Sequence, residues 1–221
     1  MDVVADPQAG IRHLKRSELF AFGFRRSGLF VYRPECPGCQ ACVAVRIPVA
    51  KFHPSRTQKR CAARNQDLHI ERCEPAYSDE IFALYQRYLA SRHPGGGMDN
   101  PTPESFREFL CTPGVECEFF LFRKDRKLVA VAVTDLLDDG LSANYTFYDP
   151  KQSHRSLGTF AILTQVAAAY RRGLPYVYLG YWIARSEKMR YKSRFRPLEL
   201  YHEGRWRIWS REASEPPIDA C

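Results

Sequence analysis

The chain has 221 residues, which is enough for one large domain or two small, closely packed ones. Hydrophobic residues make up 45% of the chain and aromatic residues 13%, so a sizeable core can form. The 33 Lys and Arg residues exceed the 25 Asp and Glu residues, and the formal net charge is +8. This excess favours anionic partners, nucleic acid among them, although many basic proteins bind no nucleic acid.

The sequence shows no signal for secretion or for a membrane span. Its first residues, MDVVADPQAG, are polar and acidic and lack the apolar core of a signal peptide. No run approaches the roughly 20 apolar residues that a membrane span needs, because LVAVAVTDLL is short and contains Asp135. Eight cysteines without a secretion signal are typical of a reducing cytoplasm, where clustered thiols bind metal or stay free. We therefore expect a soluble, cytoplasmic protein.

The first half of the chain predicts a mixture of helices and strands. Gly23 is a typical end for an opening amphipathic helix, whose apolar residues recur at helical spacing: Ile11, Leu14, Leu19 and Phe22. Ser55 is a suitable N-cap for a basic helix that continues to about residue 64. The other expected elements are strands over 29–33, 43–49 and 68–73 and a helix over 78–92.

The second half predicts several strands and one long helix. The expected elements are a glycine-rich loop over 93–103, a helix over 103–110, strands over 117–122, 128–135 and 141–148, a helix that begins near residue 157 and stops at 171–173, a strand around 177–179 and a hairpin over 198–209. We expect the tail beyond Arg211 to be disordered. Together these elements predict an α/β (α+β) fold with a mixed sheet and a soft domain boundary near residues 67–75.

The most informative stretch runs from Asn144 to Pro197. A strand, a loop ending in Ser156-Leu157-Gly158 and a helix bring free backbone N–H groups to a helix N-terminus, which is a natural anion site. A segment rich in tyrosines and basic residues, from Tyr181 to Arg196, follows one strand later. This arrangement suits a donor that ends in a nucleotide better than a small neutral donor.

These motifs carry a family resemblance. The segments FYDP, SLGT and YLGYWIARSEKMRYKSRFRP resemble the aminoacyl-tRNA–protein transferases, and earlier segments agree in order: GFRRSGLFVYRP, CPGCQAC, PSRTQKR, YLASRH and VAVAVTD. Within that family they look like the bacterial aspartate/glutamate leucyltransferases, and the matches extend from about Gly23 to Arg207. The resemblance implies a GNAT-like acyltransferase fold, with a small cysteine-containing N-terminal subdomain over 1–67 and a catalytic domain over 68–221.

The resemblance also implies the reaction. The family moves an amino acid from tRNA to the N-terminal α-amine of a protein. The leucyltransferases take leucine from Leu-tRNA, and their acceptors begin with Asp or Glu and are thereby marked for degradation that depends on the N-terminal residue. We expect direct transfer, without an acyl-enzyme, because an α-amine titrates near pH 8 and the ester is already activated. Positioning and oxyanion stabilisation should then matter more than a strong base.

Three residues are candidates for the chemistry. Asp149 sits where the central strand ends and is the most credible carboxylate to hold or deprotonate the amine, although Asp-Pro also commonly begins a turn. Tyr148 and Tyr181 are candidates to donate a hydrogen bond to the oxyanion or to the leaving ribose oxygen. Either tyrosine could equally be a core residue with a satisfied hydroxyl.

Substrate contacts are expected in the same stretch. An acceptor that begins with Asp or Glu requires a cation, and arginine binds carboxylates in bidentate fashion. We favour Arg190, with Lys188 second, as ligands of the acceptor or of a phosphate, and the full set of candidates is Lys188, Arg190, Tyr191 and Lys192. The backbone of Ser156, Leu157, Gly158 and Thr159 is expected to bind the 3′-terminal nucleotide, although SLGT also reads as an ordinary helix start.

Basic residues nearer the N-terminus are candidates for tRNA contact. Arg25 and Arg26 follow a helix end, and a helical face carries Arg56, Lys59 and Arg60 at positions i, i+3 and i+4. These side chains could follow phosphates, which gives affinity but little sequence recognition, or they could form a solvated cationic face. Three aromatic residues could stack on the terminal adenine or pack in the core: Tyr32, Phe52 and Trp182.

Cys36, Cys39 and Cys42 could direct thiolates at one zinc ion or iron–sulfur cluster. Both normally need four ligands, and the family's additional cysteine lies in an N-terminal CPYLP-like segment that this chain begins too late to contain. Substitutes are His53, Cys61, Cys73 or upstream sequence. Alternatively, the three thiols are reduced and packed. We expect any metal to be structural or regulatory, and the chemistry to need no cofactor.

Other functions compete with leucyl transfer. An arginyl-tRNA–protein transferase would need a carboxylate in the donor pocket, and the CxxCxxC arrangement favours leucine. A CoA-dependent N-acetyltransferase would normally have a Gln/Arg-x-x-Gly-x-Gly/Ala loop, whereas HRSLGTF has one glycine. A non-catalytic RNA-binding module is the third alternative.

Overall fold

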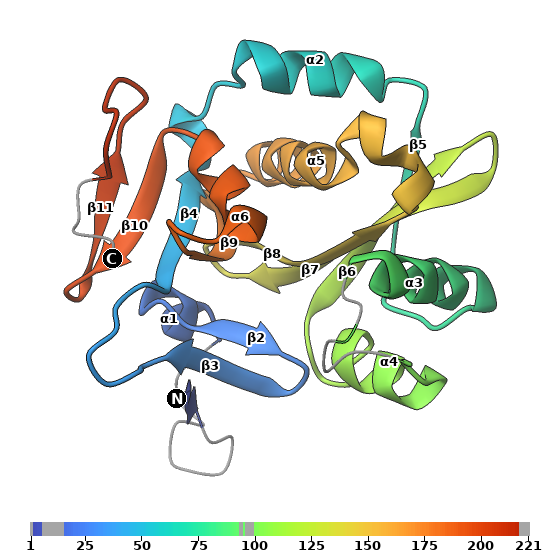
Figure 1. Ribbon diagram of the computed structural model, residues 1–221, viewed down its shortest axis with the longest axis horizontal. Coiled ribbons are helices and arrows are strands. Elements are labelled where there is room, and N and C mark those ends of the chain that lie inside the picture. The colour runs from blue at the N-terminus through green and yellow to red at the C-terminus, as the bar shows by residue number, and fades with distance from the viewer. Residues whose placement is uncertain (1, 6–15, 93–94, 96–99, 217–221) are drawn as a thin grey trace. The chain divides into compact units, whose positions relative to one another are not determined.

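The computed structural model describes residues 2–5, 16–92, 95 and 100–216. Its main sheet has eight strands in the order β11-β10-β4-β9-β8-β7-β6-β5, and a second sheet has the order β1-β3-β2 (Figure 1). Most neighbours in the large sheet are antiparallel, but β8 pairs with β9 in parallel over Gly140–Ser142. The sheet is therefore mixed, as predicted.

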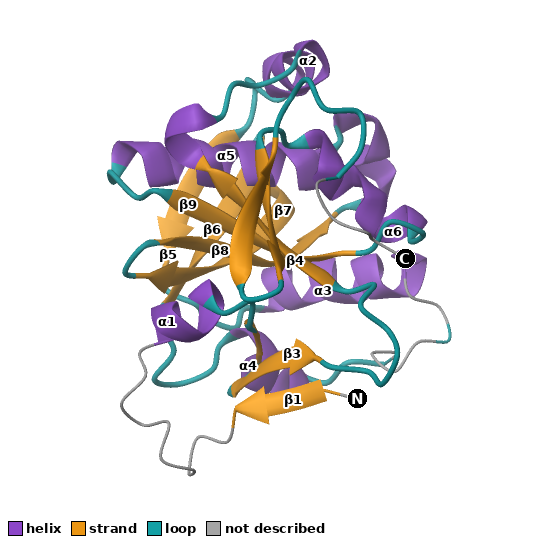
Figure 2. Cartoon of the chain, turned by 90° about the vertical axis from the view of Figure 1, so that its left-hand side faces the viewer, coloured by secondary structure: helices purple, strands orange, loops and turns teal. Residues whose placement is uncertain are grey.

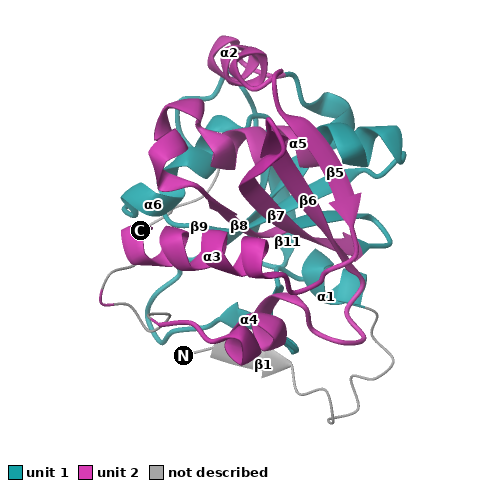
Figure 3. Cartoon of the chain, turned by 90° about the vertical axis from the view of Figure 1, so that its right-hand side faces the viewer, with its two compact units in different colours: residues 1–53, 137–142, 166–221 teal, residues 54–136, 143–165 magenta. Residues whose placement is uncertain are grey.

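The chain divides into two compact units (Figure 3). Unit 1 comprises residues 1–53, 137–142 and 166–221, and unit 2 comprises residues 54–136 and 143–165. These units divide the chain differently from the boundary that we place after residue 67, which stays a prediction.

Unit 1 holds the three-stranded sheet and, from the large sheet, strands β4 and β9 and the C-terminal hairpin of β10 and β11. Its elements are β1 (Asp2–Ala5), α1 (Arg16–Ala21), β2 (Arg25–Ser27), β3 (Phe30–Pro34), β4 (Val43–Pro48), η2 (Val49–Lys51), β9 (Tyr176–Trp182), α6 (Glu187–Arg190), η4 (Tyr191–Arg194), β10 (Leu198–His202) and β11 (Arg205–Trp209).

A buried arginine organises part of unit 1. Arg46 of β4 is 7% exposed, and its Nε donates to Glu199 of β10 at 2.7 Å. Its guanidinium lies 3.5 Å from the ring centroid of Tyr176 and 4.2 Å from that of Trp206. A charge removed from water needs such a partner and such an aromatic enclosure, so this cluster ties β4, β9, β10 and β11 together.

Unit 2 holds most of the helices. Its elements are α2 (Arg56–Arg64), β5 (His69–Cys73), α3 (Asp79–Arg92), α4 (Pro103–Leu110), β6 (Cys117–Lys124), β7 (Lys127–Leu137), β8 (Gly140–Tyr148), η3 (Pro150–Arg155) and α5 (Leu157–Arg171), of which β7, β8 and α5 each extend into unit 1. Helices α3 and α5 lie on opposite sides of the strands (Figure 2). On the α3 side, Phe106, Phe119 and Phe147 share one core cluster with residues of α3.

Alternation along the strands explains this layering. Phe119 faces the cluster with α3 and α4, whereas Phe122 packs its ring against Phe160 of α5 at 5.6 Å between centroids. Successive strand residues point to opposite faces, so a strand covered on both sides must be apolar throughout. Strand β7 meets this requirement from Leu128 to Val133, where six consecutive buried residues are apolar. The next two, Thr134 and Asp135, are also buried and are hydrogen-bonded to Gln165 and Asn144.

Most predicted elements are confirmed. Ser55 caps α2 through a capping box with Gln58, and the final hairpin turns at Glu203 and Gly204, both with positive φ. Part of the expected opening helix, with Ile11 and Leu14, lies outside the described residues, as do parts of the 93–103 loop and of the tail. The sequence interpretation missed the short elements β1, β2, η3, α6 and η4.

Candidate active site

In unit 2, Asp149 follows the last residue of β8 and is the N-cap of η3. It is 5% exposed, its N–H donates to Val129 O at 2.9 Å, and its Oδ1 accepts from Lys151 N–H at 3.0 Å. The carboxylate therefore caps the turn, as the Asp-Pro alternative expected. A carboxylate has four lone-pair positions, so this bond leaves acceptor capacity for a substrate amine.

Tyr148 stands next to the start of α5. Its hydroxyl accepts a hydrogen bond from Arg92 Nη2 at 2.9 Å, and its ring packs edge-on against Tyr88 at 5.1 Å. A Cβ added to Gly158 would lie 3.8 Å from the Tyr148 ring, so the tyrosine and the helix start are close neighbours. Because the hydroxyl accepts from Arg92, its own proton remains available for donation.

The first backbone N–H groups of α5 have no acceptor within the helix. Phe160 N–H is the first to bond within the helix, to Ser156 O at 3.1 Å, so the N–H groups of Leu157, Gly158 and Thr159 precede the helical ladder. Ser156 adopts the left-handed conformation with φ 55°. Such an end favours anions through its free N–H groups and the helix dipole.

A buried network fixes this helix start. Arg155 is 6% exposed and forms a bidentate pair with Asp67, with both N–O distances at 2.8 Å. Asn65 Nδ2 donates to Arg155 O at 2.9 Å, and Cys61 Sγ lies 3.6 Å from Ser156 O. The hydrogen bond from Arg155 lowers the pKa of Asp67 below its usual value. The segment that ends α2 thus holds the residues that precede α5.

The basic face of α2 is exposed, as predicted. Arg56, Lys59 and Arg60 all face solvent, while Gln58 and Cys61 are buried on the other side. This arrangement gives phosphates access to the three cations. It is also what a solvated cationic face looks like, so the proposed contact with tRNA stays a prediction.

In unit 1, Tyr181 of β9 uses its hydroxyl internally. The hydroxyl lies 3.1 Å from Gly23 O and 2.9 Å from Tyr32 O, and burial raises the pKa of this phenol well above its usual value. The single hydroxyl proton is therefore shared between two carbonyl groups. Tyr181 holds the β2–β3 hairpin to β9 in the way that the core alternative expected.

Gly180, beside Tyr181, allows Arg25 to lie across β9. Its φ is +73°, and the register of β9 with β4 shifts at this point. A Cβ at Gly180 would come within 1.3 Å of Arg25 Nη1, so the guanidinium occupies the space that a side chain would need. A bulge with a left-handed glycine is a common way to redirect a strand beside a functional site.

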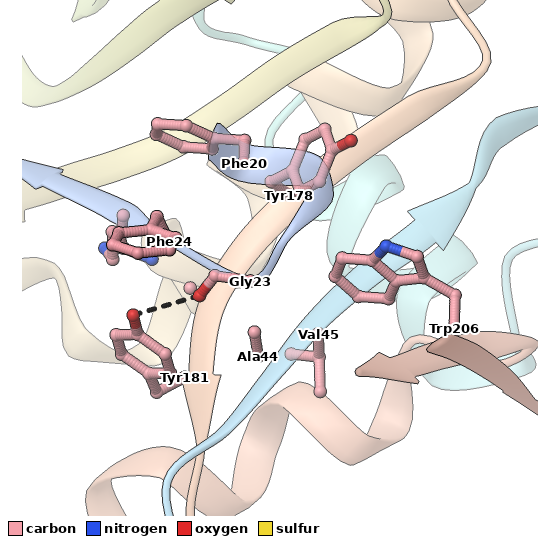
Figure 4. Close-up of a pocket in the computed structure, with 10 residues that line it drawn as sticks. Phe20, Gly23, Phe24, Ala44, Val45, Tyr178, Tyr181 and Trp206 are labelled. Carbon is pink, nitrogen blue, oxygen red and sulfur yellow. Dashed lines mark hydrogen bonds between the residues drawn. The ribbon is translucent and has the colours of Figure 1, made fainter. Parts of the chain in front are cut away.

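Arg25 also lines a small hollow in unit 1 (Figure 4). The other lining residues are mostly apolar and aromatic: Phe20, Gly23, Phe24, Ala44, Val45, Tyr178, Gly180, Tyr181 and Trp206. Its enclosed space is about 10 Å³, which is close to the roughly 10–15 Å³ that one water molecule needs. The hollow therefore has room for about one water molecule and is too small for a nucleotide.

The predicted substrate-binding residues between Lys188 and Lys192 differ in burial. Lys188, Arg190 and Tyr191 are exposed, whereas Lys192 is 8% exposed. Lys192 Nζ donates to Tyr181 O at 2.6 Å and lies 3.6 Å from Met189 Sδ. Burial, with a further contribution from Arg25, holds the pKa of Lys192 well below its usual range.

Three predicted nucleic-acid contacts are disfavoured by burial. Arg26 is 2% exposed and donates to Gly28 O at 2.9 Å, so it is not a surface ligand for phosphate. Phe52 stacks on Phe195, and Trp182 packs against Trp209. Their rings are 8% and 4% exposed, which matches the core alternative. Tyr32 is partly exposed and stays a candidate for base stacking.

The cysteine turn does not present a metal centre. Cys36 and Cys39 pair through their backbones in an isolated antiparallel β-bridge, and their free thiols are exposed. The free thiol of Cys42 is partly exposed. Within residues 2–5, 16–92, 95 and 100–216, no three Cys, His, Asp or Glu side chains gather in a way that could hold a metal ion. We therefore derive no step through a zinc ion or a cluster, and metal binding by the three thiols stays a prediction.

Comparison with known protein families identifies the family of this chain. Residues 80–202 match the family model described as arginine-tRNA-protein transferase, C terminus, and residues 2–60 match its N-terminal counterpart. The chain belongs to the aminoacyl-tRNA–protein transferase family. An enzyme of this family takes an aminoacyl-tRNA donor and a protein acceptor, so the chain is an aminoacyltransferase.

Relatives within the family are closely similar. An aspartate/glutamate leucyltransferase of Stenotrophomonas maltophilia (strain R551-3) is 50% identical over 221 residues, which covers 96% of this chain and 86% of the relative. One from Pseudomonas fluorescens (strain Pf0-1) is 53% identical over 190 residues, covering 86% of this chain and 81% of the relative. The resemblance read from the sequence motifs is confirmed.

Solved structures support the fold of the transferase. FemX matches with a TM-score of 0.50 at 11% identity, covering 80% of this chain and 63% of that chain. A C-terminal domain (DUF2156) from Agrobacterium fabrum, described as part of a lysylphosphatidylglycerol synthetase, gives 0.51 at 14% identity, covering 81% and 54%. The expected GNAT-like fold is confirmed. In the described part of the transferase, no helix is long and apolar enough to cross a membrane.

Sequence reasoning missed several residues that shape the transferase site. Arg92 bonds the Tyr148 hydroxyl, and Asp67 holds Arg155 from 88 positions away. The signal for Arg92 was its place at the end of YLASRH, but nothing local indicated its partner. Gly180 stood in the quoted YLGYW motif without an assigned role.

Proposed function

We propose that this transferase moves leucine from Leu-tRNA to the N-terminal α-amine of proteins that begin with Asp or Glu, and so marks them for degradation. The observation that carries the proposal is identity of about 50% over nearly the whole chain to relatives named aspartate/glutamate leucyltransferase. The exposed basic face of α2 and the anion-favouring start of α5 support a tRNA donor.

The reaction needs no covalent enzyme intermediate. The acceptor nitrogen attacks the ester carbonyl and forms the new amide bond, while the bond from the carbonyl carbon to the ribose oxygen breaks. One amine proton passes to that ribose oxygen, so charge and atoms balance. An α-amine with a pKa of about 8 is partly free at neutral pH, which leaves alignment of the two substrates as the main task.

Residues of unit 2 fit parts of this task. Asp149 has acceptor capacity for the incoming ammonium group or amine, and Tyr148 keeps a proton that it can donate to an oxygen. The N–H groups at the start of α5 are suited to the anionic 3′-terminal nucleotide. In unit 1, the exposed Lys188, Arg190 and Tyr191 are proposed to contact substrate.

The proposal is tested by mixing the purified chain with labelled Leu-tRNA, Arg-tRNA or acetyl-CoA and a peptide that begins with Glu. Label that reaches the peptide only from Leu-tRNA is the expected result. Label from Arg-tRNA or acetyl-CoA would replace leucyl transfer by one of the alternatives. Retention of RNA on a filter without transfer would point to a binding module.

A further inference from the structure

Two cationic side chains contact neighbouring residues of β9 in unit 1. Arg25 of β2 lies across Gly180, and Lys192 of η4 bonds the carbonyl group of the next residue, Tyr181. Arg25 contributes to the depressed pKa of Lys192, which shows that the two groups feel each other's charge. Arg33 also acts on Tyr181, so the surroundings are electropositive.

Lys192 has uncharged hydrogen-bond partners. Its Nζ contacts the Tyr181 carbonyl oxygen and Met189 Sδ, and the side chain is almost fully buried. A buried lysine beside an arginine is costly, because like charges repel and burial disfavours the ammonium form. An anion entering between the two cations would remove both penalties. Strongly perturbed groups with this physical origin cluster at functional sites.

The backbone around the pair is built to keep it in place. Gly180 supplies a surface without a side chain on which the Arg25 guanidinium rests, with φ +73° and no Cβ. The Tyr181 hydroxyl binds Gly23 O and Tyr32 O and so fixes the strand hairpin that carries Arg25. Tyr181 thus positions both cations, one through its hydroxyl and one through its carbonyl group.

We propose that Arg25 and Lys192 together bind the side-chain carboxylate of the acceptor's N-terminal Asp or Glu. This assignment rests on the proposed function and moves Arg25 from the tRNA-binding set to the acceptor site. A carboxylate at the tip of a short side chain is narrow enough to approach a lysine that is 8% exposed. A backbone phosphate carries a ribose on each side and favours exposed cations such as those of α2.

The test compares peptides that differ only in Glu or Gln at the first position. Lys192→Met and Arg25→Gln are each expected to lower kcat/KM for the Glu peptide about 10- to 100-fold relative to the Gln peptide, because a charge-assisted hydrogen bond is lost. Lys51→Met removes an exposed lysine of unit 1 that has no assigned role and should leave the ratio unchanged. The KM for Leu-tRNA should not change in any of the three variants.

Calorimetric binding of the same two peptides without tRNA gives a readout that does not require chemistry. The wild type should bind the Glu peptide more tightly, and both variants should lose that preference. Thermal unfolding shows whether each variant is folded at the assay temperature, and Arg25→Gln carries the test if Lys192→Met is not.

Three results would overturn the assignment. Equal losses for Glu and Gln peptides would make the pair merely structural. An unchanged ratio would place the carboxylate elsewhere, and a raised KM for Leu-tRNA with a new salt dependence would assign the pair to RNA phosphate. Failure of the wild type to transfer leucine at all would instead refute the proposed function, and the carboxylate assignment with it.

Discussion

Gly180→Ala tests most directly whether the absence of a side chain at Gly180 holds the Arg25 guanidinium in place. Two effects add at this position. An alanine with φ near +73° is strained by about 1–2 kcal/mol, and its Cβ would come within 1.3 Å of Arg25 Nη1 and 2.3 Å of Arg25 Cζ. The guanidinium terminates a flexible side chain, so the clash is relieved by moving Arg25 rather than the backbone, at a further cost of about 1 kcal/mol.

Gly173→Ala provides the matched control. Gly173 has φ +69° at the end of α5, and a Cβ there meets nothing within 4 Å, so this variant carries the backbone strain alone. Chemical denaturation should therefore show a larger loss of unfolding free energy for Gly180→Ala than for Gly173→Ala. The difference of about 1 kcal/mol corresponds to about 2–4 °C in Tm for a chain of this size.

A double-mutant cycle isolates the clash. In an Arg25→Ala background, Gly180→Ala should cost only the strain that Gly173→Ala measures, because no guanidinium remains to be displaced. Transfer to the Glu peptide should also fall in Gly180→Ala but not in Gly173→Ala. Equal stability losses at Gly180 with and without Arg25 would refute the packing argument.

Three further outcomes follow from the site. Asp149→Asn should lower kcat for leucine transfer by about 10- to 1,000-fold. The Tm should change little, because the amide oxygen of Asn still caps the turn. An unchanged kcat in single-turnover kinetics would remove Asp149 from the chemistry. Arg56→Gln with Lys59→Gln should weaken Leu-tRNA binding and reduce its salt slope by about 1–2 units, whereas an identical slope would leave α2 as a solvated face. Asp67 has a lowered pKa in the folded state, so its pair with Arg155 stabilises the fold above pH about 4, and this stabilisation is lost as the pH falls through the lowered pKa. The difference in unfolding free energy between wild type and Asp67→Asn should therefore shrink on acidification. A difference that stays constant with pH would contradict this.

Local signals explain what the sequence predicted correctly. Ser55 and Gln58 form a capping box within four residues, and the turn at Gly204 is set by the residues beside it. The strands β6, β7 and β8 were recognised because their apolar runs are bounded by turn residues. The family motifs then supplied the reaction, which no periodicity in the chain indicates.

Long-range partners explain what the sequence could not give. Whether a basic residue is buried depends on contacts far along the chain, so Lys188 and Lys192 look alike in sequence but only Lys192 is buried. Arg155 is held by Asp67, and Tyr181 by the carbonyl groups of Gly23 and Tyr32, which lie far away in sequence. The burial of Arg26 could not be predicted for the same reason.

The central claim is leucine transfer to an acidic N-terminus, and the mass of the product tests it most directly. A peptide that begins with Glu is incubated with the wild-type chain and Leu-tRNA, and the product is sequenced by tandem mass spectrometry. The account predicts one added leucyl residue, joined to the α-amine ahead of Glu, and no addition to the N-acetylated peptide. An unmodified peptide, or leucine attached to a lysine side chain, would contradict it.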